Sequence, residues 1–204
     1  MGRKEDRKRM FQDYGSEFYI LRDAGPVSGE YLVVELNAQV TKPFIREHFR
    51  EVLFQYDTAV VTHDPLRFAA TQEVLITVNV TPNLHAGVVV ENAGVLYKCN
   101  VSGEITRPSG ERSATTYQWE DSWATIKSDA YALLTQGLYG TDLDQEEDIG
   151  QLEVQNLRLY VPESYGARTL DRYSPTSGEN YKIEAIEKFR FPGIVVCQVA
   201  EDTR

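Results

Sequence analysis

The stretch LRLYVP at residues 157–162 decides the fold, together with the two apolar runs that follow it at 181–187 and 193–200. Each run has the length and the β-branched or aromatic content that favour a strand. Turn residues and a polar stretch separate the runs, and no helical pattern lies between them. Strands spaced in this way pair antiparallel, because a parallel crossover needs a dozen or more residues. The sequence therefore predicts an antiparallel β-meander at the end of the chain.

Short strand patterns also continue upstream of this meander. They lie at residues 18–21, 30–36, 57–62, 74–80, 87–90, 95–101 and 115–119. Gly, Pro, Asn and Asp residues separate many of them, which is typical of all-β proteins. We predict a mainly β chain that forms an antiparallel β-barrel or sandwich with one short helix and long loops. No internal repeat at a fixed period is visible.

One segment, residues 41–53, has a helical pattern. Thr41 can cap a helix, and Pro43 suits the first helical turn. Apolar side chains then recur with the spacing of one helical face, ending at Val52 and Leu53. This segment is the one helix that the sequence predicts.

Charge is distributed unevenly along the 204 residues, whose formal net charge is −10. The first nine residues hold two carboxylates and five cations, a formal charge of +3, so the remainder carries −13. The cations are Arg3, Lys4, Arg7, Lys8 and Arg9. We predict a basic flexible arm at 1–12, a β-rich N-terminal part at 13–110 and a C-terminal barrel part at 111–204. The last two parts could also form one continuous domain.

This charge pattern and the hydropathy limit the classes of partner. An acidic remainder argues against a broad nucleic-acid-binding surface, which needs clustered cations. No apolar run reaches the roughly 20 residues of a membrane helix. The charged residues 1–10 lead into no apolar segment, so we expect no signal peptide.

The sequence contains no recognisable catalytic or metal-binding signature. The acidic stretch that begins at Asp142 has the initial spacing of a calcium loop, but Glu147 stands where that loop needs glycine. Cys99 and Cys197 lie in separate apolar runs and are predicted to be buried free thiols. His63 is interpreted as a turn residue, because the chain lacks a nucleophile elbow that could use it. We expect no enzymatic activity, no cofactor and no metal.

Tyrosine is abundant, with 12 residues against 8 phenylalanines. Its apolar ring and polar hydroxyl suit protein interfaces, although β-sheets favour tyrosine in any case. With the five cations of the arm, four tyrosines form the candidate assembly interface: Tyr160, Tyr165, Tyr173 and Tyr181. The candidate channel or contact loops contain Asp142, Asp144, Glu146, Glu147, Asp148, Arg168, Asp171 and Arg172.

The C-terminal segment resembles one protein family. A strand that ends at Pro162, a loop with Asp171, then Gly178, Tyr181-Lys182-Ile183 and a last strand led by Gly193 are similar to the C-terminal half of tailed-bacteriophage head-closure (stopper) proteins. The resemblance covers about 50 residues, and residues 1–110 depart from it. It implies a β-barrel core without enzymatic activity, and a long loop that narrows a channel.

The resemblance also implies a location and partners. Such proteins are structural components of the virion neck, assembled in the host cytoplasm as homo-oligomeric rings between the portal or adaptor protein and the tail. A hexameric or dodecameric ring would contact a tail terminator or tail tube protein, and double-stranded DNA would pass through without specific binding. No membrane is involved.

Two alternative functions remain open at the level of sequence. The chain could be another phage structural β protein, such as a tail terminator, a capsid decoration protein or a baseplate component. It could also be a glycan-binding β module, in which Trp119 and Trp123 stack on sugars.

Overall fold

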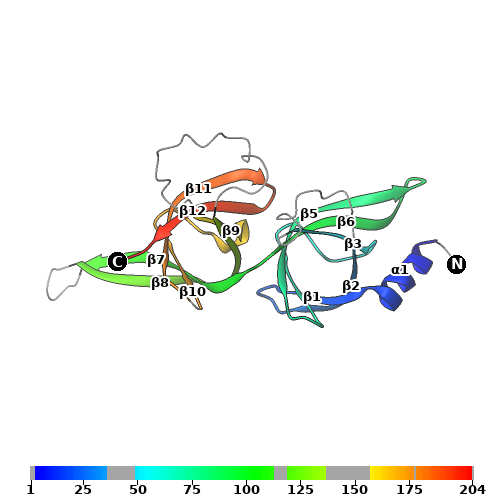
Figure 1. The fold of residues 1–204 in the computed structure, drawn as a ribbon, viewed down its shortest axis with the longest axis horizontal. Helices are drawn as coiled ribbons and strands as arrows, with labels where there is room; N and C mark the ends of the chain where they lie inside the picture. Colours follow the sequence, from blue (N-terminus) through cyan, green and yellow to red (C-terminus); the bar gives the residue numbers. More distant parts are fainter. Residues whose placement is uncertain (1–2, 36–48, 113–118, 137–156, 177, 204) are drawn as a thin grey trace. The chain divides into compact units, whose positions relative to one another are not determined.

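The computed structural model describes residues 3–35, 49–112, 119–136, 157–176 and 178–203 (Figure 1). The chain divides into two compact units. The first contains residues 1–99 and 191–193, and the second contains residues 100–190 and 194–204. The division therefore falls after Cys99 rather than near residue 110.

The first unit is a closed antiparallel barrel of six strands preceded by a helix. In chain order the elements are α1 (Arg3–Tyr14), β1 (Ser16–Ile20), β2 (Val27–Val34), β3 (Phe49–Gln55), β4 (Pro65–Phe68), β5 (Val74–His85) and β6 (Val88–Lys98). Around the barrel the strands follow the order β1-β2-β3-β6-β5-β4. Pairing of Phe18 with Phe68 closes the ladder between β1 and β4. Phe18, Leu32, Phe54 and Leu96 lie in the buried core.

The second unit is also a closed six-stranded antiparallel barrel. Its elements are β7 (Val101–Arg112), β8 (Trp119–Gln136), β9 (Leu157–Pro162), the 3-10 turn η1 (Glu163–Tyr165), β10 (Arg172–Pro175), β11 (Tyr181–Phe191) and β12 (Ile194–Glu201). The order around the barrel is β7-β8-β9-β12-β11-β10. The prediction of a mainly β, antiparallel barrel is therefore confirmed. The stretch LRLYVP is β9, and it pairs with the last strand, β12, and not with β11.

The two barrels repeat one topology, strand for strand. In each, the first strand pairs with the second and the fourth, and the third pairs with the second and the sixth. The register agrees as well, since Ile20 lies opposite Leu66 in the first barrel and Ile105 lies opposite Tyr173 in the second. The chain is thus a structural repeat, which a search for a fixed sequence period did not find.

The predicted helix at 41–53 is wrong over the part that the structure describes, because Phe49–Gln55 forms β3. Val52 and Phe54 are buried on alternate positions, and β3 pairs with both β2 and β6. This pairing buries the apolar side chains with the period of a strand, which overrides the local helical pattern. Residues 41–48 lie outside the described residues.

The N-terminal segment, predicted to be a flexible arm, is the helix α1. It is anchored on the first barrel by the fully buried Phe11. Arg7 also pairs with Glu91 of β6 at 2.5 Å, and Lys8 pairs with Asp57 at 2.5 Å. Partners this distant in the sequence cannot be identified from the composition of the segment. Within the described residues, no helix is both long and apolar enough to span a membrane.

A network around Glu73, the residue that precedes β5, links two strands of the first barrel, β3 and β6. Its carboxylate lies 2.8 Å from Arg50 of β3 and 2.7 Å from Lys98 of β6. The hydrogen bond from Lys98 and the nearby charge of Arg50 lower the pKa of Glu73 below its usual range. Stability from this network is therefore present above the usual carboxyl pKa and is lost as the pH falls through the lowered one.

Replacement of Glu73 by glutamine is expected to reduce the free energy of unfolding by up to about 1 kcal/mol at pH 7, as for a partly exposed ion pair. The difference from wild type should shrink as the pH falls toward 3, because the wild-type carboxylate is then protonated as well. Urea unfolding followed by circular dichroism at several pH values measures this. Glu104→Gln, on the exposed surface of β7, is the control. A difference that is constant with pH would contradict the prediction.

Candidate functional site

A buried carboxylate, Asp171, fixes the loop that precedes β10 in the second barrel. Only 1% of its side chain is exposed, and it accepts two hydrogen bonds from Arg107, both of 2.9 Å. The Arg107 guanidinium also donates to the carbonyl of Gly166 at 2.9 Å. The backbone N–H of Arg168 donates to Asp171 at 2.7 Å. Arg107 on β7 thus binds both ends of the loop. It holds Asp171 through a bidentate pair and Gly166 through a separate hydrogen bond.

The first barrel has the same arrangement at the corresponding place. Asp64 accepts hydrogen bonds from Arg22, at 3.2 and 2.6 Å, and from the N–H of Val61, at 2.9 Å. Arg22 also donates to the carbonyl of Ala59 at 2.7 Å. The residues before the two aspartates, His63 and Leu170, have φ values of 73° and 75°. We call each such set, Arg22–Asp64 and Arg107–Asp171, an Arg–Asp clasp.

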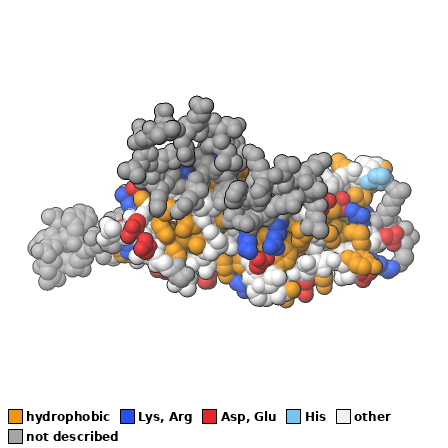
Figure 2. Space-filling model, viewed as in Figure 1, with side chains coloured by type: hydrophobic (Ala, Val, Ile, Leu, Met, Phe, Trp, Pro, Cys, Tyr) orange, Lys and Arg blue, Asp and Glu red, His pale blue; other side chains and the backbone are white. Residues whose placement is uncertain are grey.

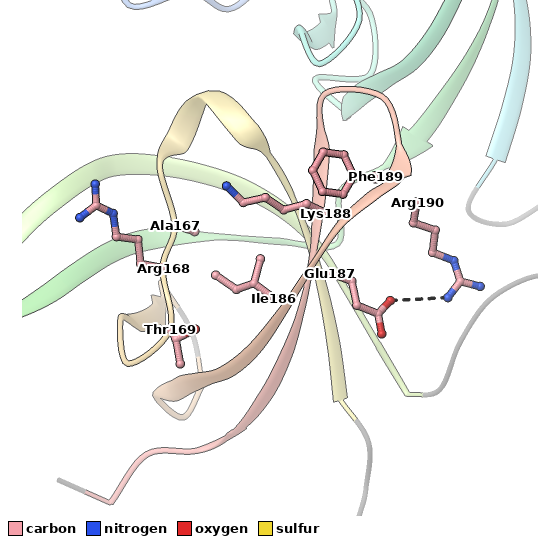
Figure 3. A pocket seen from close by; sticks show the side chains of 8 residues that line it. All are labelled: Ala167, Arg168, Thr169, Ile186, Glu187, Lys188, Phe189 and Arg190. Carbon is pink, nitrogen blue, oxygen red and sulfur yellow. Dashed lines mark ion pairs between the residues drawn. The ribbon is translucent and has the colours of Figure 1, made fainter.

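The clasp of the second barrel supports one wall of an open pocket of about 890 Å³ (Figure 3). Residues 167–169, the loop held by Asp171, form this wall. The other wall is the end of β11, residues 186–190. In Figure 3, Ile186 lies between the two walls, while Lys188 extends across the pocket. The clasp therefore holds this wall in place before a ligand binds.

The pocket carries an exposed aromatic side chain and a positive charge. Phe189 is 96% exposed, and its φ of 75° is rare for a bulky residue. The lining contains three cations, Arg168, Lys188 and Arg190, and one carboxylate, Glu187, so its formal charge is +2. Lys188 also lies 3.7 Å from Glu163, a carboxylate outside the lining. Glu187 forms only long contacts, 3.8 Å to Arg190 and 3.5 Å to Arg158.

The matching part of the first barrel has no such chemistry. There the loop before the clasp is Val60-Val61-Thr62, and β5 contains no Lys, Arg, Asp or Glu from Val78 to Leu84. The same fold therefore forms without cations at this place. Folding alone does not require Arg168, Lys188 and Arg190, which makes the pocket the best candidate for a functional site.

The structure places the sequence-predicted tyrosines mainly in the core. Tyr160, Tyr165 and Tyr173 are at most 7% exposed, and Tyr181 packs against the same core from a half-buried position. The prediction that these side chains form a surface interface is wrong for the three buried ones. Tyr165 and Tyr173 lie in the core of the barrel, whereas Tyr160 is buried on the opposite face of β9, where it pairs with Leu133 and Val196. The Tyr173 hydroxyl donates to the carbonyl of Ala130 at 3.1 Å.

The predicted basic and loop residues separate into distinct groups. Arg3, Lys4, Arg7, Lys8 and Arg9 lie on α1, where Lys4 and Lys8 stand over the ring of Tyr56 at 5.0 and 6.0 Å. Arg168 lines the pocket, whereas Asp171 is buried beneath it. Arg172 does not line the pocket and instead contacts Asp202 and Trp123. Asp142, Asp144, Glu146, Glu147 and Asp148 lie outside the described residues.

Arg172 is held within the second barrel by contacts that include a hydrogen bond and a stacked ring. Its Nε donates to Asp202 at 2.8 Å, and its guanidinium lies 3.8 Å from the ring centroid of Trp123. A stacked guanidinium covers the face that a sugar would use. This arrangement disfavours a glycan site on Trp123.

Both cysteines are free thiols, as predicted, but only Cys197 is a buried residue, and Cys99 is half-buried. Burial raises the pKa of the Cys197 thiol to about 12, and it also raises the pKa of Cys99. Both thiols therefore stay protonated at neutral pH. Within the described residues, no group of three or more His, Cys, Asp or Glu side chains is placed to hold a metal ion.

Sequence reasoning did not find the pocket. The one available signal was the recurrence of Ile-x-Arg at residues 20–22 and 105–107, each followed later by an aspartate. No protein-family model matches the chain, and comparisons with curated proteins and with solved structures gave no significant match.

Proposed function

We propose that this chain is a non-enzymatic structural protein of a tailed-phage neck, where identical copies form a ring between the portal or adaptor and the tail. One observation carries the proposal. The segment that resembles head-closure proteins, from Leu157 to the last strand, lies within one closed barrel. Asp171, which belongs to that resemblance, anchors a loop of this barrel. The segment that carries the resemblance thus supplies four of the six strands of this barrel, β9 to β12.

Barrel closure limits the ways in which copies can associate. A closed ladder has no free sheet edge for strand addition. Subunits of this kind contact one another through side-chain surfaces and loops, and a heterologous contact of that type closes into a ring when its rotation permits. On the visible face, acidic and basic side chains are interspersed (Figure 2). Such a surface suits specific contacts between copies better than broad adhesion to DNA.

The test is assembly of the purified full-length chain. We expect rings with a central hole in negative-stain electron micrographs, and a mass of several subunits by light scattering. The rings should bind DNA-filled heads that lack a tail, and antibody labelling of virions should place the protein at the neck. Labelling at the tail tip or on the capsid surface would favour the baseplate or decoration alternatives. A protein that stays monomeric and binds neither heads nor tails would rule out the neck role.

A further inference from the structure

We infer that the pocket of the second barrel, residues 167–169 and 186–190, binds the C-terminal end of α1 from a second copy of this chain. This inference rests on the proposed function, because it names the two surfaces that meet when copies form a ring. It follows from the charge of the pocket, from its exposed phenylalanine and from the chemistry of the helix end.

The pocket is complementary to an acidic partner. Its lining carries a formal charge of +2, whereas the whole chain carries −10, so the other residues of each copy carry −12. The net charges of two copies repel one another, so the attraction to this cavity is local and acts on an acidic segment of the second copy. The cations differ from the uncharged residues at the same place in the first barrel, so the fold itself does not explain them.

Phe189 indicates an apolar anchor within that contact. A phenylalanine that is 96% exposed loses the gain from burial, and a positive φ adds backbone strain. Aromatic side chains that fill a pocket at an interface contribute most of the energy of many complexes. The occupant should thus bring an aromatic or aliphatic group together with its carboxylates.

The end of α1 offers one aromatic side chain, Tyr14, and one carboxylate, Asp13, although the helix as a whole contains five cations against three carboxylates. Among the described residues, the strongly exposed large hydrophobic side chains include two aromatic ones, Phe189 and Tyr14. Tyr14 is 83% exposed and follows the exposed Asp13. The last turn of α1 contains no basic residue, so the negative end of the helix dipole is not neutralised there. Tyr14 can pack on Phe189 while Asp13 and the helix end face Lys188 and Arg168.

Each copy then offers a pocket on one barrel and a helix end on the other unit. Such a contact is heterologous, since the two surfaces differ, and repetition of it produces a ring if the rotation closes. The contact uses the N-terminal basic segment in a way opposite to that predicted from its charge. Arg7 and Lys8 pair within their own copy, and the acidic end of the helix faces the neighbour.

A charge swap tests the contact in the full-length protein. Lys188→Glu and Asp13→Lys should each weaken self-association at least tenfold by analytical ultracentrifugation, and the double variant should recover most of the loss. Lys182→Glu is the matched control, because it makes the same charge change on β11 outside the pocket. Single variants that associate like this control, or a double variant no better than the weaker single one, would overturn the inference.

A photo-crosslinker in place of Phe189 gives an independent readout. With p-benzoylphenylalanine at this position, we expect a cross-link to residues 12–14 of a second copy, recognised in mixtures of ¹⁵N-labelled and unlabelled protein. Cross-links only within one copy, or only to other segments, would overturn the inference.

These outcomes separate the inference from the proposed function. Rings that persist in Lys188→Glu would overturn the pocket contact and leave the neck role standing. A wild-type chain that is monomeric at every concentration would overturn the contact, and binding to tailless heads would then decide the neck role by itself.

Discussion

Replacement of Asp171 by alanine is expected to lower the free energy of unfolding of the second barrel by about 3 kcal/mol. The substitution removes a carboxylate that is 1% exposed and leaves Arg107 without its bidentate partner. It also frees the N–H of Arg168. Asp171→Asn should have a smaller effect, because the amide oxygen can still accept one of these hydrogen bonds.

The chain provides its own probe and its own control for this measurement. Both tryptophans lie on β8 of the second barrel, so their fluorescence during urea unfolding reports on that unit. Asp64→Ala removes the matching clasp of the first barrel, where Arg22 is more exposed than Arg107. We expect this variant to leave the tryptophan transition in place and to shift only the circular-dichroism signal. An Asp171→Ala protein with an unchanged tryptophan transition would contradict the structural role of the clasp.

Replacement of Tyr173 by alanine is expected to reduce the free energy of unfolding of the second barrel by about 4 kcal/mol, in the range for loss of a buried aromatic side chain. Tyr173 is fully buried, and its ring lies in the core cluster with Ile105 and Ile183. Tyr173→Phe should lose only about 1 kcal/mol, because it removes one hydrogen bond, to Ala130, and keeps the ring. Tryptophan fluorescence during urea unfolding measures both changes.

The control is Tyr181→Ala, which truncates a half-buried tyrosine next to the same core. Its effect should be less than half that of Tyr173→Ala, in line with the smaller apolar area that it exposes. If Tyr173→Ala reduced association between copies without loss of stability, the side chain would belong to an interface after all.

The class of fold could be predicted because it depends on local patterns. In runs such as 157–162, apolar side chains recur at every second position among β-branched and aromatic residues. This pattern favours a strand in any β architecture. Barrel closure could not be predicted in the same way. It depends on short strands such as β10, Arg172–Pro175, which pairs with β7 across more than sixty residues of chain. Four residues with a proline carry no strand pattern of their own.

The repeat was hidden for a related reason. Ile20 and Asp64 are 44 positions apart, whereas Ile105 and Asp171, which hold the same places, are 66 positions apart. A fixed period cannot relate two copies that differ by 22 residues in this interval. The helix predicted at 41–53 failed because Phe49, Val52 and Leu53 fit one helical face, whereas pairing with β2 and β6 makes this segment a strand that buries Val52 and Phe54.

The candidate site was beyond sequence reasoning for the most part. The sequence predicts Arg168 and Asp171 as loop residues but not their different roles. Arg168 lines the pocket, whereas Asp171 is buried beneath it, where it pairs with Arg107. Phe189 carries no sequence signal, since its exposure and its positive φ are properties of the folded strand. The tyrosines show the converse, because their number suggested a surface interface, whereas Tyr160, Tyr165 and Tyr173 are buried.

The two clasps provide an internal reference for comparing this chain with related sequences. Folding requires a residue pair that occurs in both barrels, such as Arg22–Asp64 and Arg107–Asp171. We expect related chains to conserve this pair in both barrels. A residue that appears in one barrel alone, such as Lys188 or Phe189, is free of that requirement and should change when the neighbour it meets changes. Comparison of the two barrels within one chain thus separates residues conserved for folding from residues conserved for binding to a neighbouring molecule.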